Sequence, residues 1–229
     1  MKKFLLIILM FFIQNMAFSE LVFIEYNVNM ENFWQKYGFE NQKVQNVSRR
    51  IIHANSLKRA PVYVVRKKVR AEVYCNIYSK KIIMTQGVLQ YLSNDDELAF
   101  LLAQQLAFVQ EPYDGIIKMA AISVNHKKYM YKADLRAIDY MVKAGFNPVA
   151  AIIAGNKLFA EPIWDWGFTY REPAGSKRLL KMYEYIYKKY PSYLDSNMAN
   201  NAVFVDFVTQ YQREINSFVQ KQNRKNDSL

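Results

Sequence analysis

The pattern of apolar positions divides the first half of the chain into a helix and several strands. From Asn41 to Leu57, apolar residues recur every three or four positions, which predicts an amphipathic helix. Residues 61–65, 69–78 and 82–85 are rich in β-branched and aromatic side chains and predict two to three short antiparallel strands. Gly87 marks the transition to a short helix expected over 88–92.

The second half of the chain is patterned for helices. Glu97 follows Asn94 by three positions, and this capping-box pattern predicts a helix that runs to about Gln110. Further helices are expected over 115–144, with a break near residue 125, and over 149–159, 177–190 and 202–219. Residues 161–175 have the composition of a loop. A small antiparallel sheet that precedes and packs with many helices predicts a mostly helical α+β domain.

The N-terminus has the organisation of an export signal. Lys2 and Lys3 precede the apolar run 4–13, and Ala17 and Ser19 place small residues at the positions that a signal peptidase reads. An uncleaved anchor is the alternative, but the run is short for a helix of about 20 residues that spans a membrane. We therefore expect an exported protein, periplasmic or secreted, with membrane association left open. The expected division is a signal peptide at 1–19, an extension at 20–40, the main domain at 41–195, a C-terminal helix at 196–220 and a disordered tail at 221–229.

Charge and cysteine content limit the partners and the chemistry. The chain carries 31 Lys and Arg against 20 Asp and Glu, a formal charge of +11, or +9 once Lys2 and Lys3 are removed. This excess favours acidic partners such as an anionic membrane surface or acidic proteins. The basic residues are scattered, so nucleic acid is not expected. Cys75 is the one cysteine, which excludes an internal disulfide, and we expect it to be buried in a strand.

Four segments, in a fixed order, carry a resemblance to a known family. They are KIIMTQGVL at 81–89, SNDDELAFLLAQQLAFV at 93–109, YMYKADLRAIDYMVKAGFNP at 129–148, and Glu172-Pro173 followed by Arg178. Together they resemble the strand, zinc helix, second helix and downstream motif of HtpX-like metallopeptidases, which belong with the CAAX-type proteases to peptidase family M forty-eight. The resemblance implies a zincin-like fold over 41–195, in which a sheet precedes the former zinc helix.

The same resemblance shows that the catalytic side chains are replaced. The family's three zinc ligands fall on Gln104, Phe108 and Met130, its general base falls on Gln105, and its downstream histidine falls near Glu172. An amide is a poor zinc ligand and a poor base, and a phenyl ring is neither. The family residues that persist are Glu97, Asp134 and Arg178. We therefore expect no catalytic residues and no cofactor, with zinc only if other ligands have taken over.

The two histidines do not supply such ligands by themselves. His126 and Met130 are one helical turn apart and could present two donors to a soft metal, but packing is the more ordinary role for such a pair. His53 is expected on a helix face. A hydrolytic zinc site needs three protein ligands and one open position, and neither histidine has a third ligand in the sequence pattern.

The preferred function is therefore binding without catalysis. An exported pseudopeptidase would bind extended peptides or envelope proteins along an edge strand, Val73, Tyr74, Cys75, Asn76, Ile77 and Tyr78. One alternative is an active zinc metalloendopeptidase with divergent ligands. A second alternative is an envelope structural protein that lays its basic, tyrosine-rich helix at 177–190 on anionic lipid.

Overall fold

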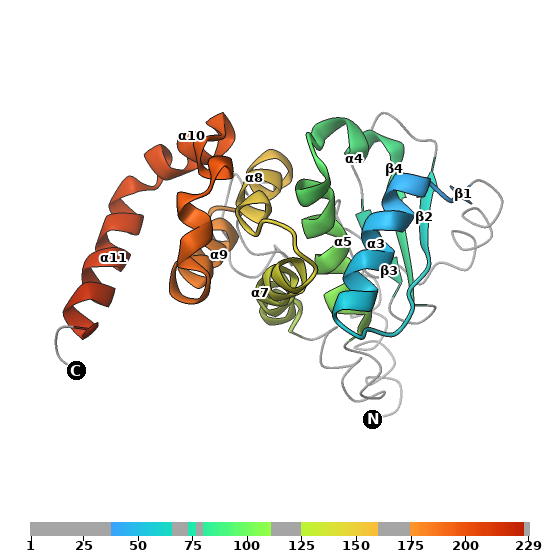
Figure 1. Ribbon diagram of the computed structural model, residues 1–229, viewed down its shortest axis with the longest axis horizontal. Helices are drawn as coiled ribbons and strands as arrows, with labels where there is room; N and C mark the ends of the chain where they lie inside the picture. The colour runs from blue at the N-terminus through green and yellow to red at the C-terminus, as the bar shows by residue number, and fades with distance from the viewer. Residues whose placement is uncertain (1–37, 66–72, 77–79, 111–124, 160–174, 227–229) are drawn as a thin grey trace, which may run out of the picture.

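The computed structural model describes residues 38–65, 73–76, 80–110, 125–159 and 175–226. A small sheet and α3 (Gln42–Ala54) lie at one end of the molecule, and α10 (Ala202–Gln210) and α11 (Gln212–Asn226) lie at the other (Figure 1). Helices α5 (Asp95–Gln110) and α7 (His126–Lys143) lie between the two ends. The predicted class, a mostly helical α+β domain, is confirmed.

Helix α3 begins where the apolar period predicted. The Asn41 side chain accepts a hydrogen bond from the Val44 N–H at 3.2 Å, which satisfies one of the unpaired donors at the helix start. Val44, Val47 and Ile51 are buried against the core, as their spacing requires.

The sheet is mixed, so the prediction of an antiparallel sheet was wrong. The strand order is β1 (Gly38–Phe39), β2 (Val62–Val65), β4 (Lys81–Thr85) and β3 (Val73–Asn76). Strand β4 is antiparallel to β3 but parallel to β2, because it inserts between two strands that precede it in the chain. The sequence held a signal for this position. Residues 82–84 are apolar without alternation, and 82–85 are buried on both faces, which is typical of a central strand.

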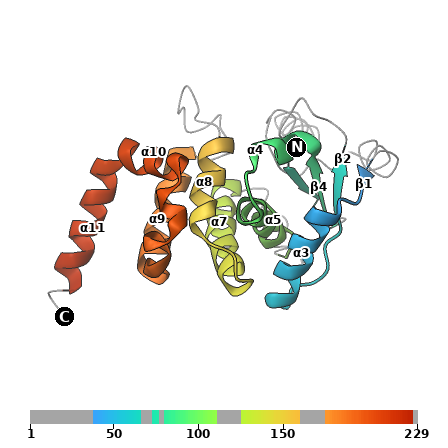
Figure 2. The same cartoon turned by 45° about the horizontal axis from the view of Figure 1, so that its top comes forward.

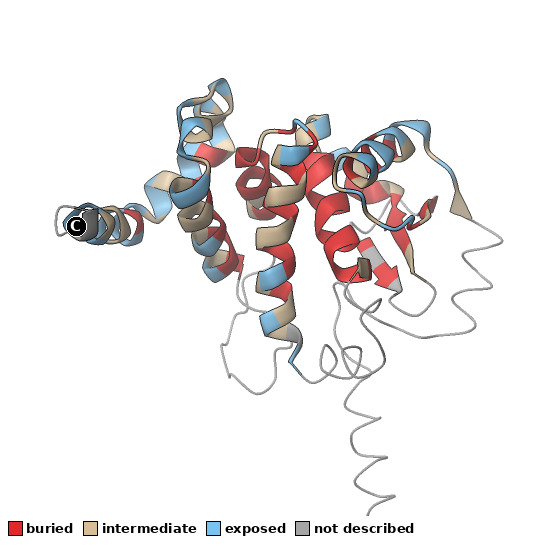
Figure 3. Cartoon of the chain, turned by 60° about the horizontal axis from the view of Figure 1, so that its bottom comes forward, coloured by how far each residue is buried: buried red, intermediate tan, exposed pale blue. Residues whose placement is uncertain are grey.

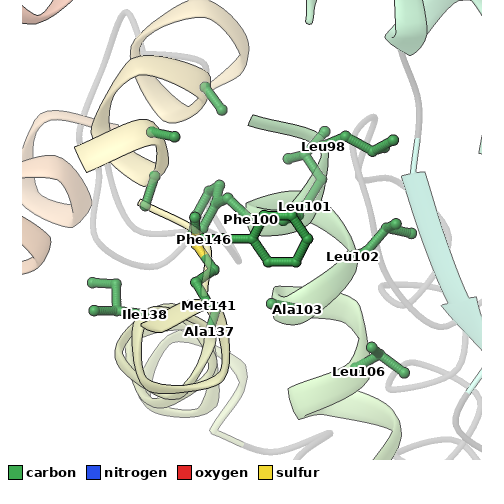
Figure 4. Close-up of a cluster of buried hydrophobic side chains, with 14 of the residues drawn as sticks. Leu98, Phe100, Leu101, Leu102, Ala103, Leu106, Ala137, Ile138, Met141 and Phe146 are labelled. Atoms are coloured by element: carbon green, nitrogen blue, oxygen red, sulfur yellow. The ribbon is translucent and has the colours of Figure 1, made fainter. Parts of the chain in front are cut away.

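Helix α5 is the centre of the fold. It follows the short α4 (Gln86–Tyr91), and every residue from Glu97 to Val109 is buried, as Figure 3 shows along the length of the helix. A helix that is apolar on all sides must be enclosed by other elements. Phe100 and Ala103 of α5 pack near Ala137 and Met141 of α7, with Phe146 beside them (Figure 4).

Helix α7 ends at Lys143, one residue before the predicted end at 144, and Gly145 follows. Gly145 adopts φ +74°, its N–H donates to the Val142 carbonyl, and the Phe146 N–H donates to the Met141 carbonyl. This pair of bonds is the Schellman arrangement, which favours glycine because the backbone is left-handed. The expected start of this helix at residue 115 lies outside the described residues.

Two further helices pack against each other, the first also against α5 and the second also against α7. They are α8 (Val149–Leu158) and α9 (Gly175–Lys189), and they continue the row of helices toward α11 (Figure 2). Helices α8 and α9 approach closely at Gly155, where an added Cβ would lie 2.8 Å from the Leu179 Cδ2. The sequence predicted the bounds of both helices to within two residues. The contacts described below join α7 to α9.

The C-terminal region differs from the prediction in two ways. After the short 3-10 turns η2 (Pro191–Asp195) and η3 (Asn197–Asn200), the single helix expected over 202–219 is two helices, α10 and α11, separated at Tyr211. Helix α11 continues to Asn226, so the tail expected from residue 221 onward was wrong for 221–226. The helix is held by buried Ile215 and by Phe218, whose ring contacts Tyr187 at 5.5 Å between centroids. Its last turns contain good helix formers.

Candidate functional site

A cluster of buried polar side chains joins α5, α7 and α9 at the centre of the molecule. Gln104 Nε2 donates to Asp134 Oδ1 at 2.5 Å, and Arg178 donates to both Asp134 oxygens, from Nε at 2.9 Å and from NH2 at 2.8 Å. All three residues are at most 3 % exposed. We call Gln104, Asp134 and Arg178 with the adjacent Gln105 the buried polar cluster.

The ion pair in this cluster is well compensated. A two-pronged contact between guanidinium and carboxylate matches both groups geometrically and is stronger than a single neutral hydrogen bond. The Arg178 Cζ also lies 3.5 Å from the centroid of the Phe159 ring, so the guanidinium is held from a second side. Such contacts offset the high free-energy cost of taking two charges out of water. Loss of either partner would leave the other charge buried without compensation.

Gln105 extends the cluster by one weak bond and leaves one atom without a partner. Its Nε2 donates to the Gln104 Oε1 at 3.3 Å, whereas its own Oε1 is buried and has no hydrogen-bond partner among the described residues. A neutral amide at this position can accept a hydrogen bond. It cannot take a proton from water at neutral pH, as a glutamate in the same place would.

The other two substituted positions are part of the hydrophobic core. Phe108 lies one turn after Gln104 on α5, and Met130 lies one turn before Asp134 on α7. Both side chains are fully buried at 0 % exposure and belong to the main apolar cluster. The structure therefore places all four substituted positions in the buried interior that α5 and α7 share with their neighbours.

These side chains do not suit a catalytic zinc ion. Zinc in hydrolases takes imidazole, thiolate or carboxylate donors from three side chains and keeps one position for water. Here Gln104 offers an amide whose N–H₂ is directed at Asp134, and Asp134 is already engaged by Arg178. Within the described ranges, no three His, Cys, Asp or Glu side chains are grouped to hold a metal. We derive no metal-dependent step from this site.

A second buried charge, at the start of α5, involves Glu97. The Asn94 side chain accepts a hydrogen bond from the Glu97 N–H at 2.9 Å, and Glu97 Oε2 accepts one from the Ser93 N–H at 3.2 Å. The predicted capping interaction is thus present, although the glutamate reaches Ser93 rather than Asn94. Lys157 of α8 completes the arrangement, with its Nζ 2.7 Å from Glu97 Oε2 and 2.8 Å from Ser93 Oγ.

The pairing of Lys157 with Glu97 was not anticipated from the sequence. Glu97 was recognised as a retained residue, and a buried glutamate requires a partner, but sequence spacing alone does not show which lysine supplies it. The link between Gln104 and Asp134 was also missed. Its signal was present, because the two residues lie at neighbouring positions in the resembled zinc site.

Strand β3 lies at the edge of the described sheet, where an edge strand was expected. Helix α5 packs against both β3 and β4. Val73 and Cys75 are buried, so one side-chain face of β3 belongs to the core. Burial raises the pKa of the Cys75 thiol to about 12, so this cysteine stays protonated at neutral pH and is not a nucleophile.

The register shows which main-chain groups of β3 point away from the sheet. The Ile82 N–H donates to the Pro61 carbonyl, so Ile82 directs its main-chain groups toward β2. The next residue, Ile83, must then direct its groups toward β3, where its partner is Tyr74.

Main-chain groups alternate along a strand, so Val73 and Cys75 direct theirs to the side away from β4. Their partners, Met84 and Ile82, form pairs without mutual hydrogen bonds in this ladder. The described edge of β3 therefore presents the N–H and C=O of two residues, spaced as an added strand would require.

Several expected site residues fall outside what the structure describes. These are Ile77, Tyr78 and Glu172, and the side chains of Tyr74, Asn76 and His126. His53 is exposed on α3, as expected of a helix-face residue. A metal site with His126 and Met130 as ligands would not be open to solvent, because the Met130 side chain is enclosed in the core.

The tyrosine-rich helix predicted at 177–190 directs aromatic side chains at other parts of the protein. Leu179 and Ile186 of α9 are buried, and the hydroxyls of Tyr185 and Tyr190 donate to Asp139 of α7 at 2.8–2.9 Å. Partial burial and the bonds to Asp139 raise the pKa of both tyrosines.

Comparison with known proteins leaves the chain without an assigned family. No family model, no curated protein and no solved structure matches it. Within the described residues, no helix has both the length and the apolar composition that a bilayer crossing requires. Function must therefore be argued from the buried polar cluster, the edge of β3 and the surface.

Proposed function

We propose that this chain is an exported, metallopeptidase-like protein with a zincin-type fold, which has lost catalysis and binds extended peptides along β3. The observation that carries this proposal is the bond from Gln104 to Asp134. In metalloenzymes, a ligating histidine commonly donates its second ring N–H to a carboxylate that orients it. Gln104, at the position of the first ligand, still donates to such a carboxylate while offering no metal donor of the usual kind.

The same interior explains why hydrolysis is not expected. Loss of a general base alone typically lowers a rate by about 10²–10⁴-fold. Loss of the metal removes the activated water and the polarisation of the carbonyl as well. With an amide at Gln105 and apolar side chains at Phe108 and Met130, neither contribution has a source in this site.

Peptide binding does not depend on those lost groups. An extended peptide can add to a sheet edge through main-chain hydrogen bonds, which need only the outward N–H and C=O groups of Val73 and Cys75. Partners would be unfolded or extended segments of peptides or envelope proteins. This proposal names no sequence preference, because main-chain pairing supplies affinity without one.

Titration with fluorescein-labelled, unfolded casein tests the proposal. Proline is tolerated at the first residue of an edge strand whose N–H faces away from the sheet. The variant Val73→Pro should therefore keep the fold and weaken binding at least about fivefold, the effect of losing one hydrogen bond of about 1 kcal/mol. Val73→Ala, which keeps the N–H, is the matched control. Binding that is absent in the wild type, or equal in both variants, contradicts the proposal.

Metal content separates this function from an active zinc peptidase with divergent ligands. Elemental mass spectrometry on the full chain, purified without chelator, should find no stoichiometric zinc. Zinc near one per chain, with chelator-sensitive cleavage of casein, would favour the enzyme instead.

A further inference from the structure

The positive charge of this protein is concentrated on two neighbouring helices. Helix α7 contains five Lys and Arg residues against two aspartates, and α9 contains five against one glutamate. The two helices thus carry +7 of the chain's formal charge of +11. The sequence alone suggested scattered basic residues, but the fold brings these two segments together.

Lysines of α9 lie in a line on the side that faces away from the core. Lys177, Lys181 and Lys188 are exposed, and they follow one another at intervals of four and seven residues, which keeps them on one helix face. At 1.5 Å per residue, this line extends over about 16 Å. The opposite face is buried, through Leu179, Met182 and Ile186.

Helix α7 borders the same surface. The contacts Asp134–Arg178 and Asp139–Tyr185 advance in the same direction along both helices, so α7 and α9 run roughly parallel. The Lys181 Nζ lies 4.3 Å from the centroid of the Tyr131 ring of α7, which bridges the two helices near solvent. Lys128, one turn before Lys132 on α7, is also exposed.

Aromatic rings support several of these lysines. The Lys188 Nζ lies 5.0 Å from the centroid of the Phe218 ring of α11, and Lys132 lies 5.8 Å from that of Tyr129. Stacking on a half-buried ring restricts a long side chain while its ammonium group remains at the surface.

Among the residues that the structure describes, the acidic groups of α7 and α9 are fewer than the basic ones. Asp139 is already engaged by Lys189 at 2.8 Å and by the Tyr185 and Tyr190 hydroxyls. Within α9, the one carboxylate is that of Glu184, which is partly exposed. The surface is therefore positive over the length of two helices.

We propose that the outer face of α7 and α9 binds the anionic headgroups of a lipid bilayer. Lysines distributed along two parallel helices suit a broad, uniformly negative surface better than one small ligand, because each can interact with a different phosphate. A basic residue near an anionic bilayer adds to the attraction, and tyrosines are favoured at the headgroup level. Lipid binding of this kind is independent of peptide binding. The lysines of α7 and α9, rather than the tyrosines of α9, make the main contact with the headgroups.

Flotation of the full chain with lipid vesicles tests the inference. Wild-type protein should bind vesicles that contain 30 mol % phosphatidylglycerol in phosphatidylcholine, and binding should weaken as salt is raised. The triple variant Lys128→Glu, Lys181→Glu and Lys188→Glu should bind at least about tenfold more weakly, because each lysine contributes to the attraction. All three residues are exposed, so circular dichroism should be unchanged.

A matched control changes the same net charge at the other end of the molecule. Arg49, Lys58 and Arg59 are exposed in and after α3, far from α9 (Figure 1). Their triple replacement by glutamate should leave vesicle binding within about twofold of the wild type, because screening confines the effect of distant charges.

Three results would overturn the proposal. Equal losses in the two triple variants would mean that net charge, not this face, determines binding. Equal binding to pure phosphatidylcholine would assign the contact to apolar insertion, for which the run at 4–13 is the obvious source. Failure to bind vesicles, with retention on immobilised polyglutamate through the same lysines, would assign the face to an acidic protein.

Discussion

The two buried ion pairs of α5 and its neighbours differ in what surrounds them. Glu97 and Lys157, at the start of α5, lie at a helix end, and the Lys157 side chain is 17 % exposed. The side chains of Asp134 and Arg178, level with the middle of α5, are 1 % and 4 % exposed, and Asp134 also accepts a hydrogen bond from Gln104. The first pair fixes a helix terminus, whereas the second joins α7 to α9 in the interior.

This difference indicates what each pair contributes to the interior. The cluster of Gln104, Asp134 and Arg178 joins α5, α7 and α9 by hydrogen bonds, while Phe108 and Met130 fill space. We therefore interpret the central pair as a link that holds three helices together, and the terminal pair as an element that any helix start of this kind would need.

The largest expected effect comes from breaking the central pair. Arg178→Met should lower the free energy of unfolding by about 3–5 kcal/mol, because it leaves Asp134 buried without a counter-charge. Urea denaturation followed by circular dichroism measures this loss. The half-exposed pair of Lys189 and Asp139 supplies the control, since Lys189→Met should cost no more than about 1 kcal/mol. Similar losses in both variants would refute a special role for the central pair.

Rebuilding the zinc site of the resembled family should change the free energy of unfolding by a smaller net amount, and this change should depend on zinc. The variant Gln104→His, Gln105→Glu, Phe108→His and Met130→Glu restores the three ligands and the base of the family. Without zinc it should be less stable than the wild type, because polar groups enter a packed core. With zinc at about 100 times its dissociation constant, roughly 2.7 kcal/mol should return.

Zinc content and zinc-dependent melting temperature measure the outcome for the rebuilt variant. A triple variant that lacks Met130→Glu is the control, because two histidines alone do not complete a three-ligand site. A rebuilt protein that folds but takes up no zinc would mean that these four positions do not converge, and the zincin-type fold would then be rejected.

The sequence predicted the elements of this fold better than their pairing. The apolar periods of α3 and α9, the capping pattern at the start of α5 and the glycine after α7 are local signals, and these helices begin or end within a few residues of the predicted positions. The apolar run at 82–84 indicates a central strand, but it does not show that this strand runs parallel to β2 and antiparallel to β3, because that depends on the path of the chain between them. Likewise, nothing in the spacing indicated that α11 would continue beyond residue 219.

The candidate site was predictable in its positions but not in its interactions. Resemblance identified Gln104, Asp134 and Arg178 separately, whereas the network among them depends on how three helices approach one another. The sequence indicated the basic helix at 177–190 as an alternative lipid-binding element, but the contribution of α7 to the same face was missed for the same reason. Lys128 and Lys181 are more than fifty positions apart in the chain, and the packing of Tyr131 against Lys181 brings their helices together.

The smallest effect is expected from substitutions at two helix starts, which can be compared. Asn94→Ala removes the acceptor for the Glu97 N–H and should cost about 1 kcal/mol, and Asn41→Ala removes the equivalent acceptor for Val44 on α3. Similar losses in urea denaturation would mean that the start of α5 is an ordinary capped terminus. A clearly larger loss for Asn94→Ala would mean that the cap also positions Glu97 for Lys157, because the buried carboxylate would then lose part of its compensation. In that case, the terminal pair would be as integral to this interior as the central one.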